Sequence, residues 1–130
     1  MSEQDVQNLR GAYDDFNAGK PDTVIALMAE DIEWVEPGGG NAAQGTFNGP
    51  QSVADEVFST IPDNFDEFSV DAEDFQDKGD IVLITGRFKG KAKSGTDLDA
   101  AFEHTWEMED GKVKRFNNGV EEEPWTAAWS

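Results

Sequence analysis

The sequence predicts an α+β fold, in which a curved, mainly antiparallel sheet forms a cone with about three helices on its concave face. Apolar residues at helical spacing are confined to the first half of the chain, whereas alternating apolar and polar residues, joined by short turns, fill the second half. Helices followed by hairpin-connected strands favour this class. No internal repeat, long linker or low-complexity segment interrupts the sequence, so we expect one domain over residues 1–130.

The first half of the chain predicts three helices. Residues 3–18 carry four apolar side chains at helical spacing: Val6, Leu9, Tyr13 and Phe16. Gly19 is a natural helix cap and Pro21 a natural first helical residue, so a second, shorter helix is expected over residues 23–29. A third helix begins at Pro50 or Ser52 and turns four apolar side chains inward: Val53, Val57, Phe58 and Ile61.

The remaining segments predict strands and loops. Residues 31–36 form a strand that places Ile32, Trp34 and Glu36 on one face. Two glycine-rich loops follow, the second around a short extended piece. Four more strands are expected, over residues 65–77, 81–91, 99–109 and 113–121. The tail beyond them holds Trp125 and Trp129.

The segment 102–116 is the most informative part of the chain. Phe102, His104 and Trp106 alternate with acidic or polar residues, so one face of this strand is apolar. Residues 110–111, Asp-Gly, supply the positive φ that a two-residue hairpin turn requires. The only histidine therefore shares its face with apolar side chains. This placement predicts either a core residue whose hydrogen bonds are satisfied or part of a pocket.

The charge of the chain limits its partners. There are 28 Asp and Glu residues against 10 Lys and Arg residues, a formal net charge of −18. Such a charge repels nucleic acids and anionic membranes, so we expect neither as a partner. The acidic residues are spread along the chain, a pattern typical of proteins from salt-accumulating halophiles, where cations screen the repulsion. An ordinary acidic protein is the alternative.

Composition also limits the chemistry and the location. The chain has no cysteine, which excludes disulfides and thiolate ligands, and its single histidine argues against zinc, so we expect no metal site. No apolar run approaches the length of a membrane span. Residues 1–5 lack the basic and apolar regions of a secretion signal. We therefore expect a cytoplasmic protein.

Several motifs, taken in their order along the chain, resemble a known family. They lie at residues 32–38, 45–53, 86–88, 104–106 and 110–116. The second has glycines four residues apart and leads into the third expected helix. Together these motifs are similar to the SnoaL-like branch of the NTF2-like superfamily, over nearly the whole chain. The resemblance implies an NTF2-like cone, a pocket and a homodimer.

The resemblance also implies candidate catalytic residues. In SnoaL-like cyclases, an acidic residue near the end of the last strand acts as acid or base beside a histidine on the preceding strand. His104 matches the histidine position. Glu121 matches the acidic position, where members often carry Asp, and Gly119 stands where members often carry an aromatic residue. No cofactor is implied.

The residue pattern adds Glu36 as a second candidate carboxyl. It shares a strand face with Ile32 and Trp34, and burial in an apolar pocket would raise its pKa toward neutrality. If the strand ends before Glu36, the chain turns this side chain outward instead. Arg87 is a candidate for pairing with a buried carboxylate or an anionic ligand group, and a surface ion pair is the alternative.

We expect a small apolar ligand held mainly by aromatic side chains. The candidate ligand-binding residues are Tyr13, Phe16, Trp34, Phe58, Arg87, Phe102, Trp106 and Asn117. A bulge in the last strand would exchange Asn117 for its neighbour Asn118.

Two functions remain open. The first is a cofactor-free enzyme that isomerises, cyclises or dehydrates an apolar carbonyl compound, with His104 and either Glu36 or Glu121 as acid and base. The second is a non-catalytic module for ligand binding or dimerisation. Trp125 and Trp129 favour a homodimer, because exposed tryptophans on so acidic a chain need a packing partner.

Overall fold

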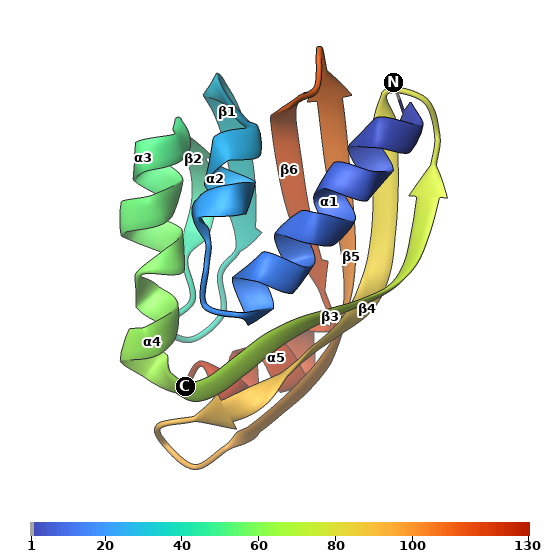
Figure 1. Ribbon diagram of the computed structural model, residues 1–130. Helices are drawn as coiled ribbons and strands as arrows, with labels where there is room; N and C mark the ends of the chain where they lie inside the picture. Colours follow the sequence, from blue (N-terminus) through green and yellow to red (C-terminus); the bar gives the residue numbers. More distant parts are fainter. Residues whose placement is uncertain (1) are drawn as a thin grey trace.

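The computed structural model describes residues 2–130, which form a six-stranded sheet and a set of short and long helices (Figure 1). The helices are α1 (Ser2–Asn17), α2 (Asp22–Leu27), α3 (Pro50–Val53), the π-helix η1 (Ala54–Phe58), α4 (Thr60–Asn64) and α5 (Glu122–Ala128). The strands are β1 (Met28–Pro37), β2 (Gln44–Asn48), β3 (Phe65–Asp77), β4 (Ile81–Ala92), β5 (Asp97–Glu109) and β6 (Lys112–Val120).

The sheet has the strand order β2-β1-β6-β5-β4-β3. Neighbouring strands run antiparallel, except that β1 and β6 pair in parallel. Helices α1 to α4 lie over one side of this sheet, and α5 closes its lower end (Figure 1). The expected α+β fold, with a curved and mainly antiparallel sheet, is confirmed.

The sheet curves most strongly where β3 and β4 cross the lower end of the molecule (Figure 1). The pairing of β3 with β4 is irregular between residues 65 and 67 and between residues 72 and 74. On β4, a Cβ atom at Gly86 would stand 2.1 Å from the carbonyl oxygen of Asp71, and one at Gly90 would stand 2.1 Å from that of Glu67. The two glycines therefore allow the backbones of β3 and β4 to approach closely at these positions.

The concave face of the sheet and the inner faces of the helices form one hydrophobic core. Helix α1 turns Leu9 and Tyr13 inward, as its apolar spacing predicts, and also buries Ala12. Ile32 of β1 and Ile84 of β4 are fully buried against them. The outer face of the sheet carries polar and charged residues, because the side chains of each strand alternate between the two faces.

Two local predictions differ from the structure. The second helix ends at Leu27 rather than at residue 29, because β1 begins at Met28, which pairs with Val113 of β6. Residues 122–128 form helix α5, which the sequence pattern did not reveal. Trp125 and Trp129 are buried within their own chain, and the indole N–H of Trp125 donates to the carbonyl of Gly38 at 3.0 Å. These tryptophans therefore supply no argument for a homodimer, which stays a prediction.

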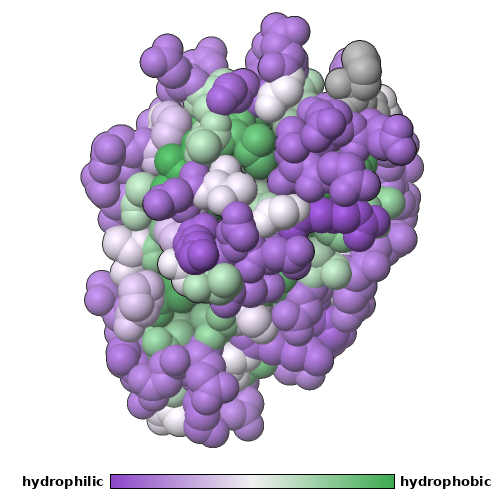
Figure 2. All heavy atoms as spheres, viewed as in Figure 1, coloured by the Kyte–Doolittle hydropathy of each residue, from purple (hydrophilic) through white to green (hydrophobic). Residues whose placement is uncertain are grey.

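The surface is strongly hydrophilic. Charged and polar residues dominate the face shown in Figure 2, with apolar residues in patches between them. Several acidic residues pair with basic ones on the sheet, including Asp97 with Lys91 and Glu33 with Arg115. These pairs are exposed to solvent, so each contributes at most about 1 kcal/mol. No helix within residues 2–130 is both long enough and apolar enough to cross a membrane.

Candidate functional site

A cavity of about 80 Å³ lies between the concave face of the sheet and the helices. Its wall is mainly aromatic and includes five of the residues that the sequence suggested for ligand binding: Tyr13, Phe16, Trp34, Phe58 and Trp106. Further wall residues with polar side chains are Glu36, His104, Asn118 and Thr60, whose hydroxyl donates to the carbonyl of Val57. The structure thus brings residues from α1, β1, η1, β5 and β6 to one site.

Glu36, His104 and Asn118 belong to a continuous buried network. The indole N–H of Trp106 donates to the hydroxyl of Tyr13 at 2.9 Å, and that hydroxyl lies 2.7 Å from Nδ1 of His104. On the other side of the ring, Nε2 of His104 lies 3.0 Å from Oδ1 of Asn118. The amide Nδ2 of Asn118 then donates to Oε1 of Glu36 at 2.9 Å.

A second indole closes the network at Glu36. The N–H of Trp34 donates to Oε2 of Glu36 at 2.6 Å. The indole N–H groups of Trp106 and Trp34 can only donate, and an ionised carboxylate can only accept. The bonds between them therefore run in one direction, from Trp106 through Tyr13, His104 and Asn118 to Glu36. This direction assigns the proton of the neutral His104 ring to Nε2.

His104 is held as a neutral ring. It is 4% exposed, and burial lowers its pKa to about 3, although the hydrogen bond to Asn118 acts in the opposite direction. Phe102 stacks on the imidazole with ring centroids 3.9 Å apart, which places an apolar surface against it. With both ring nitrogens engaged and its pKa far below neutrality, His104 positions its neighbours rather than exchanging protons near pH 7.

Glu36 is the group whose charge changes near neutral pH. It is 9% exposed, and burial raises its pKa from an ordinary 4.5 to about 7, although the hydrogen bonds from Asn118 and Trp34 lower it. The side chain points inward because β1 continues through Pro37, where it still pairs with β2. The alternative in which the strand ends before Glu36 is therefore excluded.

The hydroxyl of Tyr13 also stays protonated. Burial raises its pKa well above the ordinary value, while the hydrogen bond from Trp106 acts against that shift. The sequence pattern marked Tyr13 only as an aromatic wall residue. Its polar role was missed because its partner, His104, lies 91 residues away in the chain. The signal available in the sequence was the presence of the chain's only tyrosine on the apolar face of α1.

Asn118, rather than Asn117, reaches the cavity. The pairing of β5 with β6 shifts between Glu107 and Met108, where Arg115 and Val113 are the respective partners. This bulge lets both Val113 and Phe116 point inward, and regular alternation after Phe116 then turns residue 118 inward and residue 117 outward. The expectation that Asn117 lines the pocket is therefore corrected.

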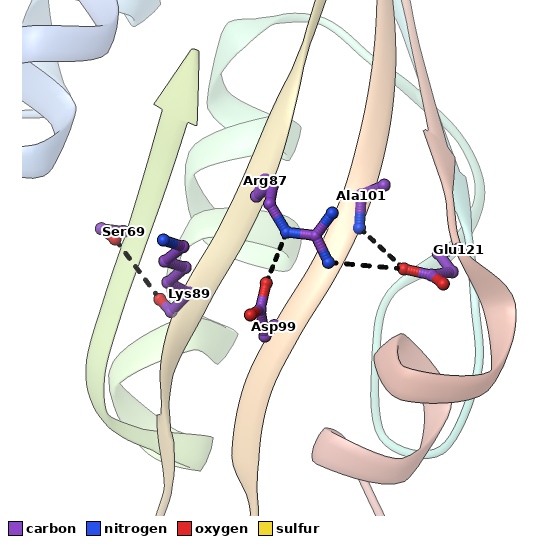
Figure 3. A network of polar contacts seen from close by, with 6 residues as sticks. All are labelled: Ser69, Arg87, Lys89, Asp99, Ala101 and Glu121. Atoms are coloured by element: carbon purple, nitrogen blue, oxygen red, sulfur yellow. Dashed lines mark hydrogen bonds and ion pairs between the residues drawn. The ribbon is translucent and has the colours of Figure 1, made fainter. Parts of the chain in front are cut away.

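Arg87 and Glu121 lie outside the cavity, on the outer face of the sheet (Figure 3). Arg87 pairs with Asp99 at 2.6 Å, and its guanidinium lies 3.8 Å from Glu121. Glu121 also accepts a hydrogen bond from the backbone N–H of Ala101 at 3.1 Å. The expectation that Arg87 and Glu121 face the ligand is therefore corrected.

Strand alternation explains the placement of Arg87, and the end of β6 explains that of Glu121. On β4, the inward position of Phe88 forces its neighbour Arg87 outward. Glu121 follows the last residue of β6 and leads into α5, so it lies beyond the inward-facing part of that strand. Phe102 is buried but packs behind His104 rather than at the cavity wall.

Trp125 of α5 and Trp129, the residue that follows this helix, are two wall residues that the sequence did not suggest. The indole Nε1 of Trp129 is buried and has no hydrogen-bond partner among the described residues. Within residues 2–130, no group of three or more His, Cys, Asp or Glu side chains is arranged to hold a metal ion.

A family model described as a SnoaL-like domain matches residues 9–116. The chain belongs to this SnoaL-like family. A comparison with curated proteins finds no match. The matched region contains every residue of the buried network except Asn118, which lies just beyond it.

Solved structures share this fold over nearly the full length. An NTF2-like protein from Burkholderia thailandensis is 25% identical, with a TM-score of 0.86 over 98% of this chain and 95% of that one. Bal32a, from a soil-derived mobile gene cassette, is 21% identical, with a TM-score of 0.88 over 99% and 98% of the two chains. TerC, co-crystallised with polyporic acid, is 25% identical, with a TM-score of 0.79 over 88% of each chain.

Proposed function

We propose that this protein is a cofactor-free acid–base enzyme in which Glu36 moves a proton on a small apolar carbonyl compound. The observation that carries the proposal is a carboxyl with a pKa of about 7 in an aromatic cavity. A group with this pKa is present in both its acidic and its basic form near neutral pH, which is the condition for efficient proton transfer. TerC provides a related fold that was crystallised with polyporic acid.

The reaction class follows from the available groups. The Glu36 carboxylate takes a proton from the carbon next to a carbonyl, and the electrons of that C–H bond move to the carbonyl oxygen to give an enolate. In an unsaturated ketone, return of the proton from the Glu36 carboxyl to the far carbon of the conjugated enolate completes an isomerisation. Attack of the enolate carbon on a second carbonyl of the substrate forms a C–C bond and an alkoxide that takes the proton back from Glu36, which gives a cyclisation. Departure of a hydroxyl from the carbon next to the enolate carbon, protonated by Glu36 so that it leaves as water, gives a dehydration. The second N–H of Asn118 is a donor beside Glu36 that supports binding of the substrate oxygen.

His104 has a positioning role in this proposal. It holds Asn118 on one side and Tyr13 on the other, so it orients the amide that donates to Glu36. The family resemblance implies that His104 and Glu121 transfer the proton. In this proposal Glu36 alone transfers it. Glu121 has no part, because it lies on the outer face of the sheet.

Exchange of hydrogen for deuterium tests the proposal without knowledge of the natural substrate. We would incubate cyclohexanone and β-tetralone in heavy water with the protein and follow the loss of the signals from hydrogens next to the carbonyl by proton NMR. We expect the protein to accelerate exchange of at least one ketone, Glu36→Gln to abolish the acceleration, and Glu103→Gln to retain it. Glu103 is a matched control, because it is exposed and adjacent to His104 in sequence.

A non-catalytic binding module is the alternative function. It is favoured if either ketone binds, as detected by a change in tryptophan fluorescence, while wild type accelerates hydrogen–deuterium exchange of neither ketone beyond the rate seen with Glu36→Gln. That result would reject the enzymatic proposal and leave the cavity as a ligand-binding site. The dimerisation version of this alternative has no support from Trp125 and Trp129, which are buried.

We also propose that the protein works at high salt concentration, as a protein of a halophile does. The support is the net charge of −18, together with the surface position of most acidic residues. Cations at about 1 M reduce the Debye length to about 3 Å and so remove most of the repulsion between surface carboxylates. The salt dependence of stability, described below, tests this proposal.

A further inference from the structure

The cavity wall has an unusual charge composition for a ligand site. Three of its residues are titratable, namely Tyr13 from α1, Glu36 from β1 and His104 from β5. Burial keeps the Tyr13 hydroxyl protonated and the His104 ring neutral near pH 7, so Glu36 is the residue of the wall that carries charge. No Lys or Arg side chain lines the cavity in the described part of the chain.

The neutral polar groups of the wall do not offset the repulsion between the Glu36 carboxylate and an anionic ligand. The hydroxyl of Tyr13 and both nitrogens of His104 are already engaged in the network. The N–H groups that remain available are the second one of Asn118 and the indole N–H of Trp129, which has no partner. Such donors hold a neutral carbonyl oxygen, but a carboxylate would still lie close to the Glu36 charge without a cation.

Aromatic rings make the same wall favourable for a positive charge. Trp34 and Phe58 approach each other edge to face with centroids 5.5 Å apart, and Trp34 donates its N–H to Glu36. Trp106 and Phe116 pack beside Trp34. Aromatic rings attract cations, most strongly where water is excluded, so the aromatic wall around the Glu36 carboxylate favours an ammonium group over an anion.

We propose that the cavity selects its ligands by charge: it accepts apolar compounds that carry a single positive charge or none, and it rejects carboxylates of the same shape. This inference rests on the proposed function only in taking Glu36 as the charged group of the site. It is tested by ligand binding alone and does not depend on turnover. It adds a substrate class, apolar compounds without an acidic group, to the proposed acid–base chemistry.

Three compounds of nearly equal shape test the proposal. Cyclohexylmethylamine is cationic, cyclohexanecarboxamide is neutral, and cyclohexanecarboxylate is anionic. Their affinities would be measured by titration against the intrinsic tryptophan fluorescence, because all four tryptophans of the chain line the cavity wall. Measurements at about pH 8.5 keep Glu36 ionised, and about 1 M KCl screens the charge of the outer surface.

We expect the amine to bind at least about tenfold more tightly than the carboxylate, with the amide between them, as befits opposite and like charges a few ångströms from Glu36. In Glu36→Gln this ratio should fall to about threefold or less, because the local charge is gone. In Glu103→Gln the ratio should stay at the wild-type value. Glu103 lies on the exposed face of β5, so this control removes one charge from the chain without changing the cavity.

Several outcomes would overturn the proposal. A carboxylate that binds as tightly as the amine contradicts selection by charge. A ratio that Glu36→Gln leaves unchanged assigns the selection to the overall charge of −18 rather than to the cavity. Failure of both the amine and the amide to bind at millimolar concentration also rejects it. Each of these results leaves the ketone-exchange experiment intact, so the two proposals fail independently.

Discussion

Replacement of Glu36 by Gln should remove a pH dependence from the stability of the fold. In the folded state the pKa of Glu36 is about 7, whereas its ordinary value, which applies to the unfolded chain, is 4.5. Between these two values the folded protein holds a proton that the unfolded chain has lost. At about 1.36 kcal/mol for each pH unit, the separation corresponds to about 3 kcal/mol of unfolding free energy.

The direction of the effect follows from the same two pKa values. A carboxyl whose pKa is raised by folding contributes its full stability below about pH 4.5, and that contribution is lost as the pH rises through about 7. His104 acts in the other direction, because its folded pKa is about 3, so its contribution is lost as the pH falls below about 6.5. The His104 contribution is common to wild type and variant, and the difference between them isolates Glu36.

Urea unfolding followed by tryptophan fluorescence measures this difference. Wild type, Glu36→Gln and Glu103→Gln would be compared between about pH 4.5 and 8.5 in about 1 M KCl, so that surface carboxylates are screened. The unfolding free energy of wild type minus that of Glu36→Gln should fall by about 3 kcal/mol across this range. Glu103→Gln should follow the wild-type curve.

The glutamine side chain also changes the hydrogen bonds, and this cost must be kept apart from the charge effect. Trp34 and Asn118 both donate to Glu36, so an amide nitrogen in place of one oxygen would leave one donor unpaired. That loss, about 1–3 kcal/mol, is independent of pH and shifts the whole curve. A difference between wild type and Glu36→Gln that stays constant with pH would refute the reasoning about the buried carboxyl.

Three further predictions concern stability. His104→Phe should fold but lose about 2–5 kcal/mol of unfolding free energy in urea titration, because Tyr13 and Asn118 each lose a buried partner; a loss below about 1 kcal/mol would count against the network. Gly86→Ala should cost at least about 2 kcal/mol, since its Cβ would stand 2.1 Å from the carbonyl oxygen of Asp71, and a variant as stable as wild type would show that the strands need not approach so closely. The melting temperature should rise steeply from about 0.1 M to about 2 M KCl, as the net charge of −18 is screened, and a melting temperature indifferent to salt would reject the high-salt proposal.

The fold was largely accessible from the sequence because its determinants are local. Alternation along a strand predicts which side chains share a face. It places Ile32, Trp34 and Glu36 on one face of β1, and His104 and Trp106 on one face of β5. Turn residues mark where hairpins begin. Alternation also argues for the outward position of Arg87, because Phe88 faces the core. The resemblance to a family then supplied the arrangement of these strands into a cone.

The chemistry of the site was decided by the tertiary structure. A bulge in β6 selects Asn118 over Asn117, and nothing in the local pattern fixes where a bulge occurs. Tyr13 and His104 meet only because α1 packs across the sheet. Burial by these distant elements sets the pKa of Glu36 near 7, because desolvation depends on everything that excludes water from the carboxyl. Periodicity thus determined the faces of the elements, whereas long-range packing determined which group in the cavity changes its charge.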